Sequence, residues 1–328
     1  MKVLVTGATG FIGKELLRHL SFKGFEINIL TRNPKQARSK LSIPCSVYQW
    51  NPEKESPDIK SFKNVKAVIH LAGENIASGR WTQKRKAHIK NSRILSTQRL
   101  VKAIEKLEHK PDVLVSASGI GFYGGSGNKL LTEDIPPGTC YLAKVCKDWE
   151  EEVKKVQEFN VRAVSLRTGM VLGNEGGAMG KMLLPFRMGL GGRLGNGNQW
   201  MSWIHVIDLA RMYIHAIKSP SINGIYNAVS PNPISNSEFT NTLGKFLNRP
   251  TLLSIPSFVL RLLFGDMAQA LLASQNVSPE KILSTGFQFK YESLNSALMQ
   301  IVSRSNQELQ SREMASSQEK QINKTKER

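Results

Sequence analysis

The stretch VLVTGATGFIG at residues 3–13 decides the fold of this chain. Its β-branched run ends in three glycines, Gly7, Gly10 and Gly13, and then opens onto apolar residues at helical spacing. In such a strand–turn–helix the first glycine permits a tight turn, the second lets a pyrophosphate approach the backbone, and the third allows close helix–strand packing. The free N–H groups at the start of the helix also favour phosphate. The stretch therefore predicts a dinucleotide-binding loop, and the alternative is a phosphate-free turn in another α/β protein.

Strand-like and helix-like segments alternate through the first half of the chain, which is typical of a parallel sheet with helices on both faces. Right-handed crossovers then lead to a doubly wound α/β fold of the Rossmann type, with ligands beyond the carboxyl ends of the strands. The expected strands are Lys2–Thr6, Glu26–Thr31, Ser46–Gln49, Ala67–Leu71, Val113–Ser116 and Ala163–Arg167. The expected helices include Gly13–Phe22, Gln83–Lys106 and Leu142–Glu158.

The second half of the chain has a different character. Residues 173–197 are too rich in glycine for one continuous helix, so we expect a helix only at Met179–Met188, flanked by loops. Residues 203–217 return to a strand-then-helix pattern and re-enter the main domain. Residues 231–302 favour a small, mostly helical module, with helices near 236–246, 256–273 and 278–285.

These patterns predict two structured units and a tail. Residues 1–172 and 200–230 form the cofactor-binding Rossmann domain, and residues 173–199 and 231–302 form a smaller, mostly helical substrate-side subdomain. Residues 303–328 are rich in Ser, Gln, Glu and Lys, with few apolar side chains, and predict a disordered tail.

The composition, with 40% hydrophobic and 22% charged residues, is typical of a soluble globular protein. No apolar run approaches the roughly 20 residues that span a bilayer. The chain starts directly with a strand-like run, so we expect no targeting segment before the fold. Cys45, Cys140 and Cys146 lack the spacing of metal ligands or of a disulfide framework. We therefore expect no metal and a cytoplasmic protein, with an organelle left open.

The net charge of +19 is unusually high. Its densest stretch, Arg80–Lys110, contains ten Lys or Arg residues and only two acids, Glu105 and Glu108. Such a field can steer nucleic acid, anionic lipid or a phosphorylated ligand. No nucleic-acid-reading motif accompanies it, which disfavours a nucleic-acid partner. We interpret the stretch as a solvated helix face that helps to steer an anionic cofactor.

The end of the second predicted strand distinguishes between the two nicotinamide cofactors. An NAD-preferring protein usually places Asp or Glu there to accept hydrogen bonds from the ribose 2′-OH. This chain has Thr31, Arg32 and Asn33 instead. A guanidinium cannot accept those bonds, but it suits a 2′-phosphate. The sequence therefore favours NADP over NAD, and the alternative is that Arg32 is an ordinary surface residue.

Five motifs in this order resemble the extended short-chain dehydrogenases/reductases. They are TGATGFIG (6–13), VIHLAGENI (68–76), SASGIGFYG (116–124), LRTGMVLG (166–173) and WIHVIDLA (203–210). The segments AGENIASGRW, YLAKVCKDWE and GGAMGKMLLPFRMGLGG resemble more narrowly the atypical, epimerase-like branch of the NAD-dependent epimerase/dehydratase superfamily. That branch also carries a C-terminal module of its own. The resemblance covers residues 1–302.

The resemblance implies specific cofactor contacts. The pyrophosphate would lie along the first loop, on Gly7, Thr9, Gly10, Phe11 and Ile12, with Gly13 behind them. The adenosine side of the cofactor would pass the loop that follows the fourth strand, formed by Leu71, Ala72, Gly73 and Glu74. Arg167, at the end of a later strand, would face the cofactor or else pair with an acid.

The resemblance also implies catalytic residues. Ser118 matches the family's active-site serine, whose hydroxyl would hydrogen-bond the reacting oxygen of the substrate, unless it only satisfies its own turn. Active relatives pair Tyr with Lys four residues later, because the ammonium lowers the tyrosine pKa and holds the nicotinamide ribose. Here Tyr141 is followed by Lys144 at a spacing of three, which still leaves the two as neighbours on a helix. This departure puts Tyr141 as the base in doubt and favours Lys144 as a ribose contact.

Two functions from different classes remain open at this point. The first is an NADP(H)-binding, epimerase-like oxidoreductase that acts on a hydroxyl or carbonyl carbon of a small substrate. The alternative is a catalytically impaired, cofactor-binding protein with a regulatory or scaffold role, related to cell division. The altered Tyr/Lys spacing motivates this alternative. The sequence identifies no substrate and leaves a homodimer open.

Overall fold

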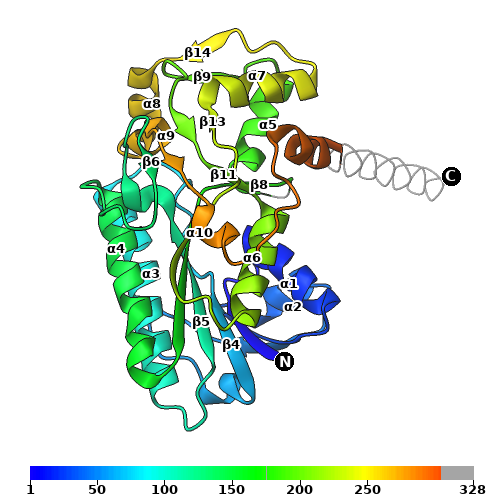
Figure 1. The fold of residues 1–328 in the computed structure, drawn as a ribbon, viewed down its shortest axis with the longest axis vertical. Coiled ribbons are helices and arrows are strands. Elements are labelled where there is room, and N and C mark those ends of the chain that lie inside the picture. Colours follow the sequence, from blue (N-terminus) through cyan, green and yellow to red (C-terminus); the bar gives the residue numbers. More distant parts are fainter. Residues whose placement is uncertain (175, 304–328) are drawn as a thin grey trace, which may run out of the picture.

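A seven-stranded parallel sheet forms the centre of the molecule (Figure 1). The structure, a computed structural model, describes residues 1–174 and 176–303. Neighbouring strands follow the order β12-β7-β5-β4-β1-β2-β3. Their bounds are β1 Lys2–Thr6, β2 Glu26–Thr31, β3 Ser46–Gln49, β4 Val65–His70, β5 Val113–Gly119, β7 Arg162–Thr168 and β12 Gly224–Ala228. The predicted doubly wound α/β fold is therefore confirmed, and the first three strands have the predicted bounds.

Helices cover both faces of this sheet. On one face α1 (Phe11–Phe22) packs against α6 (Val206–Lys218), and both contribute to one apolar core with the sheet. On the other face α3 (Gln83–Glu105) packs against α4 (Tyr141–Lys154) over a second core. The smaller elements beside the sheet are α2 Pro34–Lys40 and the 3₁₀ turns Ile59–Phe62, Ile120–Tyr123 and Lys155–Phe159.

A second, smaller lobe lies at the top of Figure 1. It contains α5 Met179–Arg187, β9 Gly192–Leu194, α7 Asn236–Leu247, β14 Leu253–Ile255, α8 Ser257–Phe264 and α9 Met267–Leu272. Short strand pairs join it to the sheet, with the bounds β6 Leu130–Leu131, β8 Met170–Leu172, β10 Trp200–Met201, β11 Trp203–His205, β13 Ile234–Ser235 and β15 Asn276–Val277. The helix α10 is Glu280–Leu283, and residues 294–303 form a last helix.

The structure corrects one sequence-based expectation in this lobe. The single helix expected near 256–273 is two helices, because Gly265 at φ +59° ends α8 in a backbone conformation that does not continue a helix. The predicted tail lies outside the described residues apart from Ser303. None of the helices within residues 1–174 and 176–303 has the length and apolar character that crossing a membrane requires.

The topology fixes where a ligand should bind. From β1 the chain runs outward through β2 and β3, then returns to the other side of β1 and continues through β4, β5, β7 and β12. The strand order therefore reverses between β1 and β4. In doubly wound sheets ligands bind beyond the carboxyl ends of the strands at this point. The segments that follow β1 and β4 are thus the first place to look for a site.

Candidate functional site

The loop between β1 and α1 contains three glycines, two of which leave no room for a side chain. Gly7 has φ +70°, and a Cβ there would lie 2.6 Å from the backbone carbon of Leu71, at the end of β4. A Cβ on Gly13 would lie 2.3 Å from the backbone oxygen of Gly7. Gly10 differs, because a Cβ there would meet only the Gly7 oxygen, at 3.2 Å. Gly7 and Gly13 thus serve the turn and the packing, while Gly10 is exposed at the helix entrance, where a phosphate would approach.

The N-terminus of α1 is open to an anion. Gly10 is its N-cap residue, with no side-chain cap, and the first turn contains no acidic residue. The first N–H groups of a helix have no partner within the helix and carry the positive end of its dipole. The ring of Phe11 packs closely against Gly173, Gly176 and Gly177, which holds this end of α1 against the loop after β8. These features fit a pyrophosphate.

The end of β2 carries positive charge without a nearby acid in the sequence. Arg32 is exposed and has no hydrogen bond or ion pair within residues 1–174 and 176–303. Asn33 caps α2, with its Oδ1 accepting the Gln36 N–H at 3.0 Å. The first acid after Glu26 is Glu53. A guanidinium suits a phosphate and offers no acceptor to a ribose hydroxyl.

A buried histidine links β1 to β4 beneath the loop. Thr6 Oγ1 lies 2.7 Å from His70 Nδ1 and accepts the Ala72 N–H at 3.1 Å. His70 Nε2 lies 3.2 Å from the hydroxyl of Ser96, which donates its own proton to the Ser92 carbonyl at 2.7 Å. The network therefore assigns the His70 proton to Nε2 and the acceptor role to Nδ1. Burial lowers the pKa of His70 to about 3, so the ring is neutral at physiological pH.

An inward-facing arginine supports the loop after β4, and the sequence interpretation missed it. Arg93 of α3 donates to the carbonyls of Glu74 (3.0 Å) and Ile89 (2.9 Å), and its guanidinium lies 5.3 Å from the Trp149 ring centroid. A Cβ on Gly73 would come within 3.3 Å of this guanidinium, so the glycine makes room for it. The basic stretch predicted as a solvated face thus also contains a partly buried cation.

The predicted residue Ser118 belongs to a buried ion-pair network. Its hydroxyl donates to Glu150 Oε1 at 2.6 Å. Glu150 in turn accepts two hydrogen bonds from Arg167, 2.9 Å from Nε and 2.8 Å from Nη2. Arg167 is 1% exposed, and its guanidinium lies 3.3 Å above the Phe122 ring centroid. Although burial lowers the pKa of Arg167, its hydrogen bonds to the Glu150 carboxylate raise that pKa above its ordinary value.

The same network continues across the sheet. Arg167 also donates to the Tyr123 hydroxyl at 3.0 Å, and Tyr123 donates to Asn227 Oδ1 at 2.7 Å. The Asn227 N–H donates to Glu133 Oε1 at 2.7 Å. Strands β5, β7 and β12 and helix α4 are thereby tied together at their ends. Of the two positions that the sequence allowed for Arg167, the structure shows the pairing with an acid.

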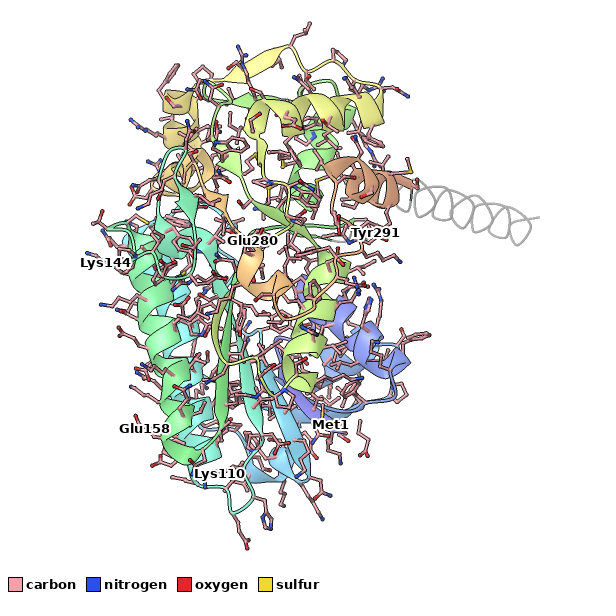
Figure 2. The ribbon with its side chains drawn as sticks, in the orientation of Figure 1. Met1, Lys110, Lys144, Glu158, Glu280 and Tyr291 are labelled. Atoms are coloured by element: carbon pink, nitrogen blue, oxygen red, sulfur yellow. The ribbon has the colours of Figure 1, made fainter. Side chains whose placement is uncertain are left out.

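Tyr141 and Lys144 lie apart from this network. The Tyr141 hydroxyl donates to the Lys86 carbonyl on α3 at 2.5 Å, and its ring lies edge-on to Trp81 at 5.6 Å. Burial raises the pKa of Tyr141. Lys144 is exposed on the outer side of α4, and its side chain has no hydrogen bond or ion pair to any other described residue (Figure 2). The structure therefore does not bring the two side chains together as a dyad.

Other residues occupy the face of α4 that meets the end of β5. A Cβ on Gly121 would lie 3.2 Å from the Leu142 side chain, and one on Gly119 would lie 3.9 Å from Cys146 Sγ. Leu142, Cys146 and Glu150 are spaced four residues apart and therefore form one stripe along α4. Burial raises the pKa of the Cys146 thiol to about 11, so it is protonated.

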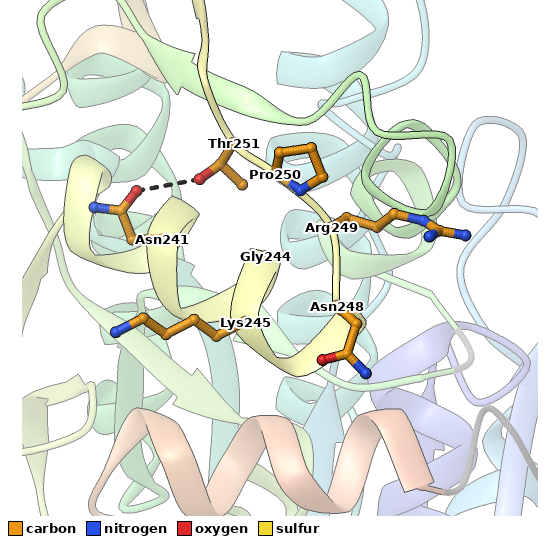
Figure 3. A pocket seen from close by; sticks show the side chains of 7 residues that line it. All are labelled: Asn241, Gly244, Lys245, Asn248, Arg249, Pro250 and Thr251. Atoms are coloured by element: carbon orange, nitrogen blue, oxygen red, sulfur yellow. Dashed lines mark hydrogen bonds between the residues drawn. The ribbon is translucent and has the colours of Figure 1, made fainter.

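Two surface pockets lie elsewhere. One of about 600 Å³ surrounds the C-terminal end of α7, where Thr251 donates to Asn241 at 3.2 Å (Figure 3). The other, of about 720 Å³, lies at the amino ends of the strands, beside Met1 and Arg162. Neither includes a residue of the glycine loop or of the Ser118 network. Across residues 1–174 and 176–303, no three His, Cys, Asp or Glu side chains are placed to hold a metal ion.

Comparison with known proteins agrees with this geometry. The sequence model of the NAD dependent epimerase/dehydratase family matches residues 3–228, and that of a domain of unknown function, DUF1731, matches residues 255–301. The chloroplastic SDR39U1 homolog of Arabidopsis thaliana, an epimerase family protein, is 40% identical over 92% of this chain and 87% of its own. YfhF of Bacillus subtilis, also an epimerase family protein, is 36% identical over 92% of this chain and 98% of its own.

A solved structure is similar over nearly the same span. The human epimerase family protein SDR39U1 (isoform 2), crystallised with NADPH, superposes with a TM-score of 0.83 at 36% identity, over 92% of this chain and 99% of that chain. Taken with the glycine loop, the switch point between β1 and β4 and the two matching sequence models, these similarities have one consequence. The chain belongs to the NAD dependent epimerase/dehydratase family.

Proposed function

We propose that this chain is an NADP(H)-dependent, epimerase-like oxidoreductase that acts on a hydroxyl or carbonyl carbon of a small substrate. The observation that carries the proposal is the open N-terminus of α1 behind Gly10, combined with Arg32 at the end of β2. The human relative that was crystallised with NADPH supports the choice of cofactor.

The residues of the loops fit this cofactor. The backbone from Gly7 to Gly13, with Thr9, Phe11 and Ile12, would hold the pyrophosphate against the helix N-terminus. Arg32 would pair with the 2′-phosphate. Leu71, Ala72 and Gly73 follow β4 at the switch point, and the backbone of Glu74 is held there by Arg93 while its carboxylate pairs with Arg85 at 2.7 Å. When bound, NADP(H) supplies or accepts a hydride.

Ser118 is the residue that we assign to the reacting oxygen. It lies at the end of β5 and is the one predicted catalytic group that the structure anchors to a buried acid, Glu150. Arg167 fixes the carboxylate on its other side, so the serine hydroxyl is held with its single proton on Glu150 and its oxygen left to accept a hydrogen bond from a substrate hydroxyl. The pKa of Tyr141 is raised rather than lowered, and Lys144 is exposed, so this pair gives proton transfer less support.

Two experiments test the proposal separately. Titration with NADPH and NADH, followed by nicotinamide fluorescence, should show at least about tenfold tighter binding of NADPH, and Arg32→Asp should remove that preference. Arg38→Asp, on the exposed face of α2, is the matched control and should leave it unchanged. Failure of the wild type to bind either nucleotide would refute the cofactor assignment.

The second experiment addresses turnover. A panel of small carbonyl compounds is screened for NADPH oxidation, and Ser118→Ala is compared with wild type on any substrate found. We expect kcat to fall by about 10²-fold or more while NADPH affinity stays the same. Equal kcat in the two proteins would remove Ser118 from the reaction.

A further inference from the structure

An unusually apolar surface covers one edge of the upper lobe. Helix α8 has the sequence SFVLRLLF, yet Leu260 is its only buried residue. Phe258 and Leu262 are each 69% exposed, and Leu263 is 58% exposed. Leu252, just before β14, is 92% exposed. A helix that is apolar on most of its sides normally lies inside a protein or against another apolar phase.

The neighbouring segment extends this surface. Strand β14 pairs with β9, with Leu253 opposite Gly192, and Arg249 donates to the Arg187 carbonyl at 2.7 Å, so the end of α5 adjoins the start of β14. Three further exposed apolar side chains come from there: Leu184, Met188 and Leu190. We call the set of Leu252, Leu253, Phe258, Leu262 and Leu263 the α8 patch. In Figure 1 the elements that carry it, β14 and α8, lie at the outer margin of the upper lobe.

The charge around the patch has a single sign. Residues 176–207 and 239–265 contain six Lys or Arg residues and no Asp or Glu. Arg261 lies within α8, and the Arg80 side chain lies against Gly265 at its end. Asp266, the first acid after α8, is paired with Lys86. The complement of this surface is therefore one that is both apolar and anionic.

We propose that the α8 patch docks the protein on the surface of an anionic lipid bilayer. Apolar side chains that enter the acyl boundary, with Lys and Arg at headgroup level, are the chemistry of interfacial membrane binding, and they need no spanning segment. A second copy of this chain fits the surface less well, because its net charge of +19 would bring like charges together. Nucleic acid would match the charge but leave the leucines in water.

The test is co-sedimentation of the full chain with phosphatidylcholine vesicles, with and without phosphatidylglycerol. We expect at least about tenfold stronger binding to the anionic vesicles. Triple replacement Phe258→Ser, Leu262→Ser and Leu263→Ser should lower that binding by about tenfold or more. The matched control replaces three exposed apolar residues elsewhere, Phe22→Ser, Ile59→Ser and Met299→Ser, and should bind like wild type.

Charge and fold are controlled separately. The pair Lys245→Glu and Arg261→Glu should weaken binding to the anionic vesicles, whereas Lys23→Glu with Lys40→Glu should leave it unchanged. Equal melting temperatures verify that all variants fold. The proposal is overturned if the wild-type protein does not bind anionic vesicles. It is also overturned if the triple serine variant binds them as tightly as wild type, since charge alone then suffices for binding. It is also overturned if sedimentation velocity shows a dimer that the serine triple dissociates, because a second copy then covers the patch.

Discussion

Removing Arg167 should destabilise the fold far more than it weakens cofactor binding. Arg167→Met leaves the Glu150 carboxylate buried, with only the Ser118 hydroxyl still donating to it among the bonds described above. Breaking a buried pair from one side costs about 3–5 kcal/mol, because the remaining charge is uncompensated. The substitution also removes the cation–π contact between the guanidinium and the Phe122 ring, which is worth up to about 2 kcal/mol when it is desolvated. We expect the free energy of unfolding to fall by about 4 kcal/mol.

A double-mutant cycle isolates the pair. Glu150→Met alone should also cost about 3–5 kcal/mol, but the double variant should cost much less than the sum, because two apolar side chains can replace a buried pair at little loss. The assay is urea unfolding followed by tryptophan fluorescence. Arg162→Met on the same strand is the control, since Arg162 donates to the carbonyls of Ala216 and Ile222 and forms no salt bridge within the described residues; it should cost about 1–2 kcal/mol.

Two results would refute this reasoning. The first is additivity of the Glu150 and Arg167 variants within about 0.5 kcal/mol, which would mean that the pair has no coupling energy. The second is an Arg167→Met protein of wild-type stability whose NADPH affinity has dropped by more than about tenfold. That outcome would restore Arg167 as a cofactor contact, the other role that the sequence allowed.

Three further predictions follow from the site. Gly7→Ala should cost at least about 2 kcal/mol more in unfolding free energy than Gly24→Ala and abolish NADPH binding, because both glycines have positive φ but only Gly7 faces the Leu71 backbone; equal losses by urea unfolding would contradict this. His70 has a folded-state pKa of about 3 against 6.5 unfolded, so only the unfolded state gains its proton between those values, and stability is full above pH 6.5 and falls as the pH drops toward 3. At about 1.4 kcal/mol per unit this amounts to on the order of 5 kcal/mol, and His70→Gln should flatten the pH dependence of the urea midpoint; an unchanged slope would argue against it. Tyr141→Phe should leave the pH profile of kcat for NADPH oxidation unchanged, whereas loss of its basic limb would make Tyr141 the proton donor in carbonyl reduction.

The sequence predicted the sheet well, because period and β-branching report burial directly. It predicted β1 to β3 to the residue. The inward position of Arg93 was missed because a count of charges does not consider which face of a helix each residue occupies. Ile89, Thr97, Leu100 and Ile104 form the buried stripe of α3, and Arg93 lies four residues from both Ile89 and Thr97. Its position on the stripe was visible in the sequence, but its carbonyl partners come from the fold.

The partners of Ser118 and Arg167 were not visible in the sequence. Glu150 is 32 residues from Ser118 and 17 from Arg167, and Asn227 is 104 residues from Tyr123. Only the adjacency of β5 and β7, with α4 against both, brings them together. Glu150 is the first of three consecutive glutamates in α4, and a helical Glu is most often solvated, so nothing local marked Glu150 as the buried one.

The register of α4 explains why the altered Tyr/Lys spacing has a chemical consequence. Residues three apart on a helix differ in direction by about 60°, so Tyr141 and Lys144 cannot both lie on the stripe of Leu142, Cys146 and Glu150 that meets β5. Tyr141 turns instead to the α3 carbonyl of Lys86, and burial raises the pKa of its phenol, which therefore stays protonated. On the face toward β5, Leu142 offers no ionisable group, and the thiol of Cys146 is held neutral. Glu150 is the polar group on this face that reaches the end of β5, where it accepts the hydrogen bond from Ser118. The substitution Ser118→Ala therefore tests catalysis more directly than Tyr141→Phe.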